Sequence, residues 1–146
     1  MLWVTRHEPH VDRCASAWLI KNFIDREALF EFISKESPIP KGATAFTLPG
    51  ADIGPVEGKT TTFDVFVEEY GVSDPIVEMI RELIHDFEIT AGEDIAKVKH
   101  TETAGICLIL RGLARTSRTD HETITKAMTV MDALYAELNE RSKQAA

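Results

Sequence analysis

The chain has 146 residues, of which 44% are hydrophobic and 27% are charged, and its formal net charge is -8 at neutral pH. This size and balance predict one globular domain with its own core, and the negative charge argues against a nucleic-acid surface. The N-terminus has no basic segment followed by an apolar run, and the longest apolar stretch, residues 104–110, is too short to cross a bilayer. We therefore expect a cytoplasmic protein without a membrane partner.

The N-terminal third of the chain predicts a small sheet packed on one helix. Leu2–Thr5 is short and apolar, as a first strand would be, and residues 29–33 and 43–48 have the same character. Between the first two strands, a helix is predicted from Asp12 to about Ile24. It is apolar around most of its circumference, which is typical of a central, buried helix. Asp12 is expected to cap its N-terminus.

The rest of the chain predicts helices, because apolar residues recur at the helical period. Asp74 and Pro75 are typical of a helix start, and Thr119 and Glu122 have the spacing of a capping box. The predicted fold class is α+β, with about three strands, about five helices in all and a single domain over residues 1–146. The four predicted helices of this part cover residues 62–70, 75–87, 103–115 and 119–141.

The most informative segment for function is the junction at residues 5–13, where the first strand meets the buried helix. Free amide hydrogens and the positive end of the helix dipole favour a bound anion there. Arg6 and Arg13 add charges and planar donors, so they are the predicted oxyanion ligands, while His10 and Asp12 are candidate metal ligands. The competing interpretation is structural: Asp12 caps the helix and pairs with an arginine, and the histidines lie in solvent.

A metal ion such as Mn or Fe could also draw ligands from the C-terminal half. His85 and Asp86 lie on one predicted helix, and Glu102 precedes the next. With His10 and Asp12 they form the candidate metal set, although no His-x-x-x-His pair or similar ligand spacing is present. Helical geometry places His85 opposite the apolar stripe, which equally predicts a surface histidine.

Three arginines, Arg111, Arg115 and Arg118, are spaced along one side of the fourth predicted helix near its end. Positive residues at that position interact favourably with the helix dipole. The alternative interpretation is a strip that binds an oxyanion or a protein partner.

The two cysteines, Cys14 and Cys107, each lie in an apolar helical run. Two cysteines do not make a disulfide framework. We expect small core residues rather than a redox or ligand pair.

Residues 5–25, Thr-Arg-His-Glu-Pro-His-Val-Asp-Arg-Cys-Ala-Ser-Ala-Trp-Leu-Ile-Lys-Asn-Phe-Ile-Asp, resemble the opening signature of the C-terminal domain of the chromate-resistance protein ChrB family. The resemblance covers nearly the whole chain, with Thr47 standing where the family pattern has an acidic residue. It implies a stand-alone domain of this type and a part in chromate resistance. Later segments agree in order: Phe46 with Pro49-Gly50, Thr62-Phe63-Asp64, His85-Asp86, Ala104-Gly105 and Asp132-Ala133-Leu134-Tyr135.

The first functional hypothesis is a chromate-resistance module that binds a metal ion, or a small oxyanion such as chromate, at the Arg6–Arg13 junction. Asp86 and Glu102 are possible contributors. One alternative is a Mn- or Fe-dependent metalloenzyme, with superoxide dismutase-like redox or hydrolase activity. Another is a protein-interaction domain without a small ligand, and self-association of the chain also stays open.

Overall fold

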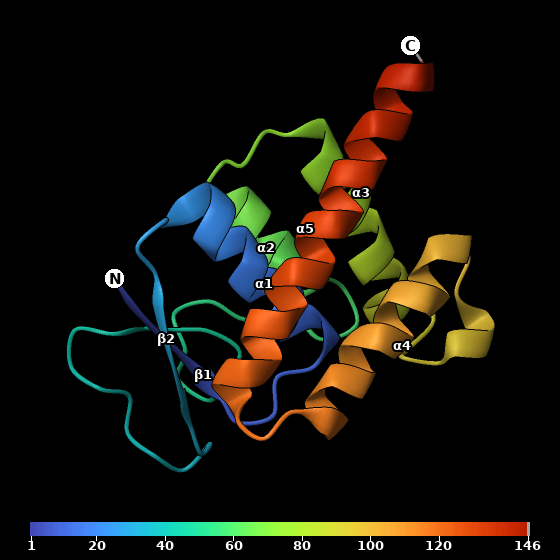
Figure 1. The fold of residues 1–146 in the computed structure, drawn as a ribbon. Coiled ribbons are helices and arrows are strands. Elements are labelled where there is room, and N and C mark those ends of the chain that lie inside the picture. Colours follow the sequence, from blue (N-terminus) through green and yellow to red (C-terminus); the bar gives the residue numbers. More distant parts are fainter. Residues whose placement is uncertain (146) are drawn as a thin grey trace.

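The computed structural model describes residues 1–145 and contains a three-stranded parallel sheet at the N-terminal end (Figure 1). β1 (Leu2–Arg6) lies in the middle, between β2 (Leu29–Ile33) and β3 (Thr44–Ala45). The predicted α+β class with its small sheet is confirmed. The third strand is shorter than predicted, because the backbone of Thr47 turns into the left-handed region, with φ of 54°.

The strand order reverses at β1, because β2 pairs with one edge of β1 and β3 pairs with the other. In open parallel sheets, the crevice beyond the carboxyl end of the strands at such a point is where ligands usually bind. The carboxyl end of β1 leads directly into the first helix. By this rule the expected ligand position lies at the junction of residues 5–13, the segment that the sequence also indicates.

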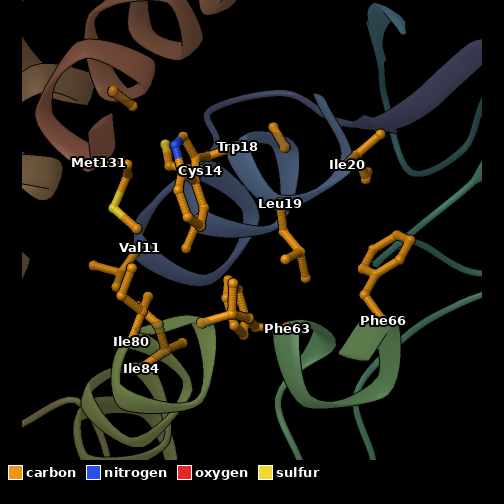
Figure 2. Close-up of a cluster of buried hydrophobic side chains, with 14 of the residues drawn as sticks. Val11, Cys14, Trp18, Leu19, Ile20, Phe63, Phe66, Ile80, Ile84 and Met131 are labelled. Carbon is orange, nitrogen blue, oxygen red and sulfur yellow. The ribbon is translucent and has the colours of Figure 1, made fainter. Parts of the chain in front are cut away.

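The first helix, α1 (Val11–Leu19), is central and buried, as predicted, and continues as one π-helical turn, η1 (Ile20–Ile24). Figure 2 shows its side chains between α2, α3 and α5. The core side chains labelled there are Val11, Cys14, Trp18, Leu19, Ile20, Phe63, Phe66, Ile80, Ile84 and Met131, and all are nearly inaccessible to solvent.

The helices that follow cover this central helix. Within residues 1–145 the chain forms five α-helices, the predicted number. Each of these helices is too short or too polar to span a membrane. Besides α1 they are α2 (Thr62–Glu69), α3 (Pro75–His85), α4 (Thr101–Thr116) and α5 (Asp120–Ala145), with short turns η2 (Asp86–Thr90) and η3 (Ile95–Lys97).

The helix starts agree with their sequence signals to different degrees. The Asp74 carboxylate accepts hydrogen bonds from the Ile76 and Val77 amides, which confirms it as the cap of α3. The predicted capping box of α5 forms only in part. Thr119 Oγ1 accepts from the Glu122 amide at 3.1 Å, but the Glu122 carboxylate turns to the Arg118 amide instead.

The buried face of α4 leaves part of its apolar sequence outside the core. Ile109 is 52% exposed, and the neighbouring Leu108 is 56% exposed. The helix instead buries Thr103, Cys107 and Leu110, at the spacing i, i+4, i+7. An apolar strip is therefore left on the outer side of α4.

Both cysteines are free and buried, as expected for core residues. Burial raises the pKa of each thiol to about 12, so the reactive thiolate is scarce at neutral pH. We predict that neither thiol reacts with a chromogenic thiol reagent in the native protein and that both react after unfolding in urea. Rapid modification of either one in the native state would contradict the buried placement.

Candidate functional site

Arg13 holds the loop between β1 and α1 in place. Its guanidinium donates hydrogen bonds to the backbone carbonyls of Arg6, His7 (3.2 Å) and Glu8 (2.7 Å), and the residue is only 7% exposed. Burial and the nearby Arg6 charge lower its pKa to about 10, so it stays protonated at neutral pH. Because its donors point at carbonyls, one of the two predicted oxyanion ligands is occupied by the protein itself.

The same loop is also tied to the start of α5. The His7 ring nitrogen Nδ1 lies 2.8 Å from a carboxylate oxygen of Asp120, and the Glu8 amide donates to the other oxygen of that carboxylate. Glu8 takes a left-handed backbone conformation, with φ of 58°. The junction is thus held from two sides and cannot change shape easily.

Asp12 does not cap its own helix, so that prediction was wrong. The N-cap of α1 is His10, which makes no side-chain cap. The Asp12 carboxylate instead crosses to α2 and accepts hydrogen bonds from the Thr62 amide at 2.8 Å and the Phe63 amide at 3.0 Å. Burial raises the pKa of Asp12 despite these bonds. Its position in the first turn of α1 is what brings it to the start of α2.

We predict that Asp12→Ala destabilises the fold by about 2 to 3 kcal/mol, because it leaves two buried amides without an acceptor. Urea unfolding followed by circular dichroism measures this loss. Asp94→Ala is the matched control, since Asp94 caps only the short, exposed turn η3, and its loss should be about 1 kcal/mol or less. Equal losses in the two variants would show that Asp12 does not hold α2.

Glu88 is the acidic residue that the sequence did not single out. It lies in η2, and its carboxyl is placed at the start of α1, where the Asp12 amide favours its charged form. Burial, followed by the charges of Asp12 and Glu93, nevertheless raises the pKa of Glu88 to about 8. The anion position at the start of α1 is therefore taken by a carboxyl group of the chain, which holds its proton near neutral pH.

The raised pKa of Glu88 makes stability depend on pH. The unfolded chain loses this proton near pH 4.5, whereas the folded chain keeps it to about pH 8, so stability falls as pH rises between these values. We predict that Glu88→Gln gains on the order of 2 kcal/mol over the natural chain between pH 5 and pH 9.

Urea unfolding at several pH values measures that difference. Glu122→Gln is the control of opposite sign, because a hydrogen bond from Lys126 and one from the Arg118 amide lower the pKa of Glu122. That variant should lose stability relative to the natural chain as pH rises toward about 4.5, and the difference should stay constant between pH 5 and pH 9, where this carboxyl is ionised in both states. A Glu88→Gln difference that does not change with pH would contradict the assignment of Glu88.

The junction encloses a crevice of about 240 Å³ at the carboxyl end of β1. Four of its charged side chains are acidic and two are basic, which makes the crevice negative when all are ionised. Arg6, the predicted oxyanion ligand that remains, is exposed at the rim and its side chain forms no hydrogen bond or ion pair within residues 1–145. The charged lining consists of Arg6, Arg13, Asp12, Glu57, Glu88 and Glu93.

A second, basic pocket of about 310 Å³ adjoins the crevice at His10. Its charged lining is Arg111 and Arg115, one turn apart on α4, with Glu8 as the acidic member. The Arg111 guanidinium lies 5.8 Å from the centre of the Phe87 ring, a cation–π contact that fixes its position. Loss of solvation, together with the charges of Arg13 and Arg111, lowers the pKa of His10.

His85 pairs with a residue that the sequence did not propose for it. Its Nδ1 lies 3.0 Å from the carboxylate of Asp64, which is buried at the start of α2 and also accepts from Arg81 at 2.7 Å. Burial alone would raise the pKa of Asp64, but hydrogen bonds from the Thr61 amide, His85 and Arg81 outweigh it and hold this pKa below its ordinary value. His85 faces a cavity separate from the acidic crevice.

Asp86 and Glu102 serve local structure. The Asp86 carboxylate is buried and accepts from the Lys99 and His100 amides and from Thr103, which holds the start of α4. Glu102 lies at another cavity and approaches Arg141 at 3.9 Å. The candidate metal set is therefore divided among three cavities, and in the described part of the chain no group of three or more His, Cys, Asp or Glu side chains is arranged to hold a metal ion.

Comparisons with known proteins point to one family. The family model described as "ChrB, C-terminal domain" matches residues 3–138. The chain belongs to the ChrB C-terminal domain family. Protein ChrB of Cupriavidus metallidurans is 28% identical over 143 residues, which cover 97% of this chain and 42% of that protein. No solved structure matches the chain significantly. The resemblance of the sequence to this family is thus confirmed.

Proposed function

We propose that this ChrB-type domain takes part in chromate resistance and binds a divalent cation, Mn²⁺ or Fe²⁺, in the acidic crevice at the end of β1. The observation that carries the proposal is the pair of carboxyl groups, Asp12 and Glu88, that share this crevice at the start of α1. Membership of the family supports the role in chromate resistance. The charge and geometry of the crevice support the choice of ligand.

The charge of the crevice favours a cation over an oxyanion. With the Glu88 proton retained, three carboxyl groups still face two guanidinium groups, and one of these, Arg13, already donates to backbone carbonyls. A dianion such as chromate would be repelled there. Hard divalent cations prefer oxygen ligands and often bind through one or two carboxylates while keeping several waters. Asp12 and Glu88 supply such a pair, and Glu57 and Glu93 also line the crevice.

Two further features are typical of a functional crevice. Its position at the point where the strand order reverses is the usual ligand site of parallel sheets. Strained backbone also gathers here: in residues 1–145 the non-glycine residues with positive φ are Glu8, Thr47 and Glu93, and all three border the crevice or the adjoining basic pocket. Such conformations concentrate at functional sites.

Titration with Mn²⁺ by calorimetry tests the proposal. Binding at pH 7 should release about one proton, because the cation displaces the proton of Glu88, and repeating the titration in buffers of different ionisation enthalpy counts it. Glu88→Gln should lose binding at least ~10-fold while the fold stays intact. Glu31→Gln, an exposed carboxyl change on β2, should bind like the natural chain. Equal affinity in the natural and Glu88→Gln proteins would overturn the proposal.

The basic pocket supports a second candidate, the binding of a small oxyanion. Two arginines on one side of α4 and the His10 ring outnumber the single carboxylate of Glu8, and planar guanidinium groups suit tetrahedral oxyanions. Calorimetry with chromate and sulfate should then show binding that Arg111→Ala removes and that Arg26→Ala, an exposed change elsewhere, leaves unaffected. Absence of heat with both anions would exclude this candidate.

A further inference from the structure

A cavity of about 470 Å³ lies beside the start of α2 and the end of α3, and it is neither the acidic crevice nor the basic pocket. Its lining includes His85 and the carboxylate to which this histidine is bonded, that of Asp64. The ion sites proposed above use neither residue. The pair therefore needs an explanation of its own.

The Asp64 carboxylate is buried and fixed in position. Asp64 is 3% exposed, and both of its carboxylate oxygens accept hydrogen bonds. One oxygen accepts from the Thr61 amide at 2.8 Å, as part of the capping box of α2, and the other accepts from the Arg81 guanidinium at 2.7 Å. His85 thus meets an acceptor that the helix start holds in place.

This carboxylate determines which ring nitrogen of His85 carries a hydrogen. Nδ1 of His85 lies 3.0 Å from Asp64 Oδ2. An ionised carboxylate only accepts, so Nδ1 donates, and Nε2 of the neutral ring keeps its lone pair. Nε2 has no hydrogen-bond partner within residues 1–145, and the side chain is 38% exposed. An oriented ring with an available lone pair is what general-base catalysis requires.

Two chemistries use a histidine that a carboxylate holds in this way, namely metal coordination and proton transfer. A transition metal on Nε2 would need further protein ligands. In the part of the chain that the structure describes, no three His, Cys, Asp or Glu side chains are arranged to supply them. The geometry therefore favours proton transfer.

The unpaired charges of the cavity indicate the kind of substrate. Two of its carboxylates accept backbone amides, and a third, that of Glu78, approaches Arg81 at 3.4 Å. The ammonium groups of Lys59 and Lys99, by contrast, have no hydrogen-bond or ion-pair partner in the described chain. Glu82 is the remaining carboxylate of the lining. Because the unpaired groups carry more positive than negative charge, they attract a small molecule with a negative group.

We propose that His85 is the general base of a site that hydrolyses small carboxylic esters carrying a negative charge. Nε2 takes a proton from a water molecule while the water oxygen forms a bond to the acyl carbon. The bond between this carbon and the alcohol oxygen then breaks, and the departing oxygen takes the proton from Nε2. Asp64 is a positioning residue, which holds the ring and balances the charge of the imidazolium. This activity is independent of the ion-binding crevice.

Hydrolysis of para-acetoxybenzoate, an anionic aryl ester, tests the proposal, and ultraviolet absorption measures the para-hydroxybenzoate released. The natural chain should exceed the buffer rate, and His85→Gln should lower kcat/KM at least ~100-fold. His7→Gln is the matched control, because His7 also pairs with a carboxylate, that of Asp120 at 2.8 Å, but lines another cavity. It should hydrolyse the ester like the natural chain.

Three results of this assay would overturn the proposal. They are a natural chain no faster than buffer, equal rates for the natural chain and His85→Gln, and an activity that a chelator removes. The last result would show that a metal ion, and not the ring nitrogen, activates the water.

The role of Asp64 has a separate readout. Asp64→Asn should lower kcat with KM nearly constant, because an amide can donate to Nδ1 and so favours the wrong tautomer. Imidazole added to the solution should restore activity to His85→Ala and not to Asp64→Asn, with circular dichroism confirming that both variants are folded. A change of KM alone in Asp64→Asn, or no rescue of His85→Ala, would contradict the pair.

Substrate charge is tested with a neutral ester of the same shape, para-acetoxybenzamide. Lys99→Ala should raise KM for para-acetoxybenzoate at least ~3-fold, as expected for loss of an exposed ion pair, and should leave KM for the neutral ester unchanged. Lys35→Ala, an exposed change away from the cavity, should affect neither. An equal change of KM for both esters in Lys99→Ala would overturn the assigned substrate class.

Discussion

The arrangement of this domain depends on one buried interaction, in which the Asp12 carboxylate of α1 accepts the first two amides of α2. A helix start carries amide hydrogens without intrahelical partners, and burying them unpaired is unfavourable. The Thr62 and Phe63 residues that carry these amides are fully buried, so they require an acceptor from the protein. By supplying it, Asp12 sets the position of α2 relative to α1 and, with it, the wall of the crevice.

This use of Asp12 has a consequence for the start of α1. Because the Asp12 carboxylate contacts α2, it does not occupy the start of its own helix. The Glu88 carboxyl, from the turn η2 that follows α3, lies there instead. Two carboxyl groups thus come together in a poorly solvated crevice, and the pKa of Glu88 rises as a result. The Arg13 guanidinium, which the sequence places beside an anion, instead holds the carbonyls of the β1–α1 loop. Contacts within the protein therefore use most of the charged groups at this junction.

Much of the fold was predictable because it follows from local patterns. The apolar circumference of α1 required burial on every side, and the periodic stripes of the later helices gave their number and approximate limits. The cap of α3 was also predictable, since Asp74 and Pro75 act only on the residues next to them. On α4, Leu110 is buried and Ile106 and Leu113 pack against the core, but Ile109 is exposed although it fits the same helical period. Which side of α4 faces the core depends on its neighbours.

The sequence by itself determined the family and the α+β class, because these depend on residue types and short spacings. Only the tertiary structure decided what the charged residues there contact. Asp12 with Thr62, His85 with Asp64 and Glu88 with the start of α1 all join residues far apart in sequence. Such contacts depend on how helices pack against one another, and no local pattern encodes that packing.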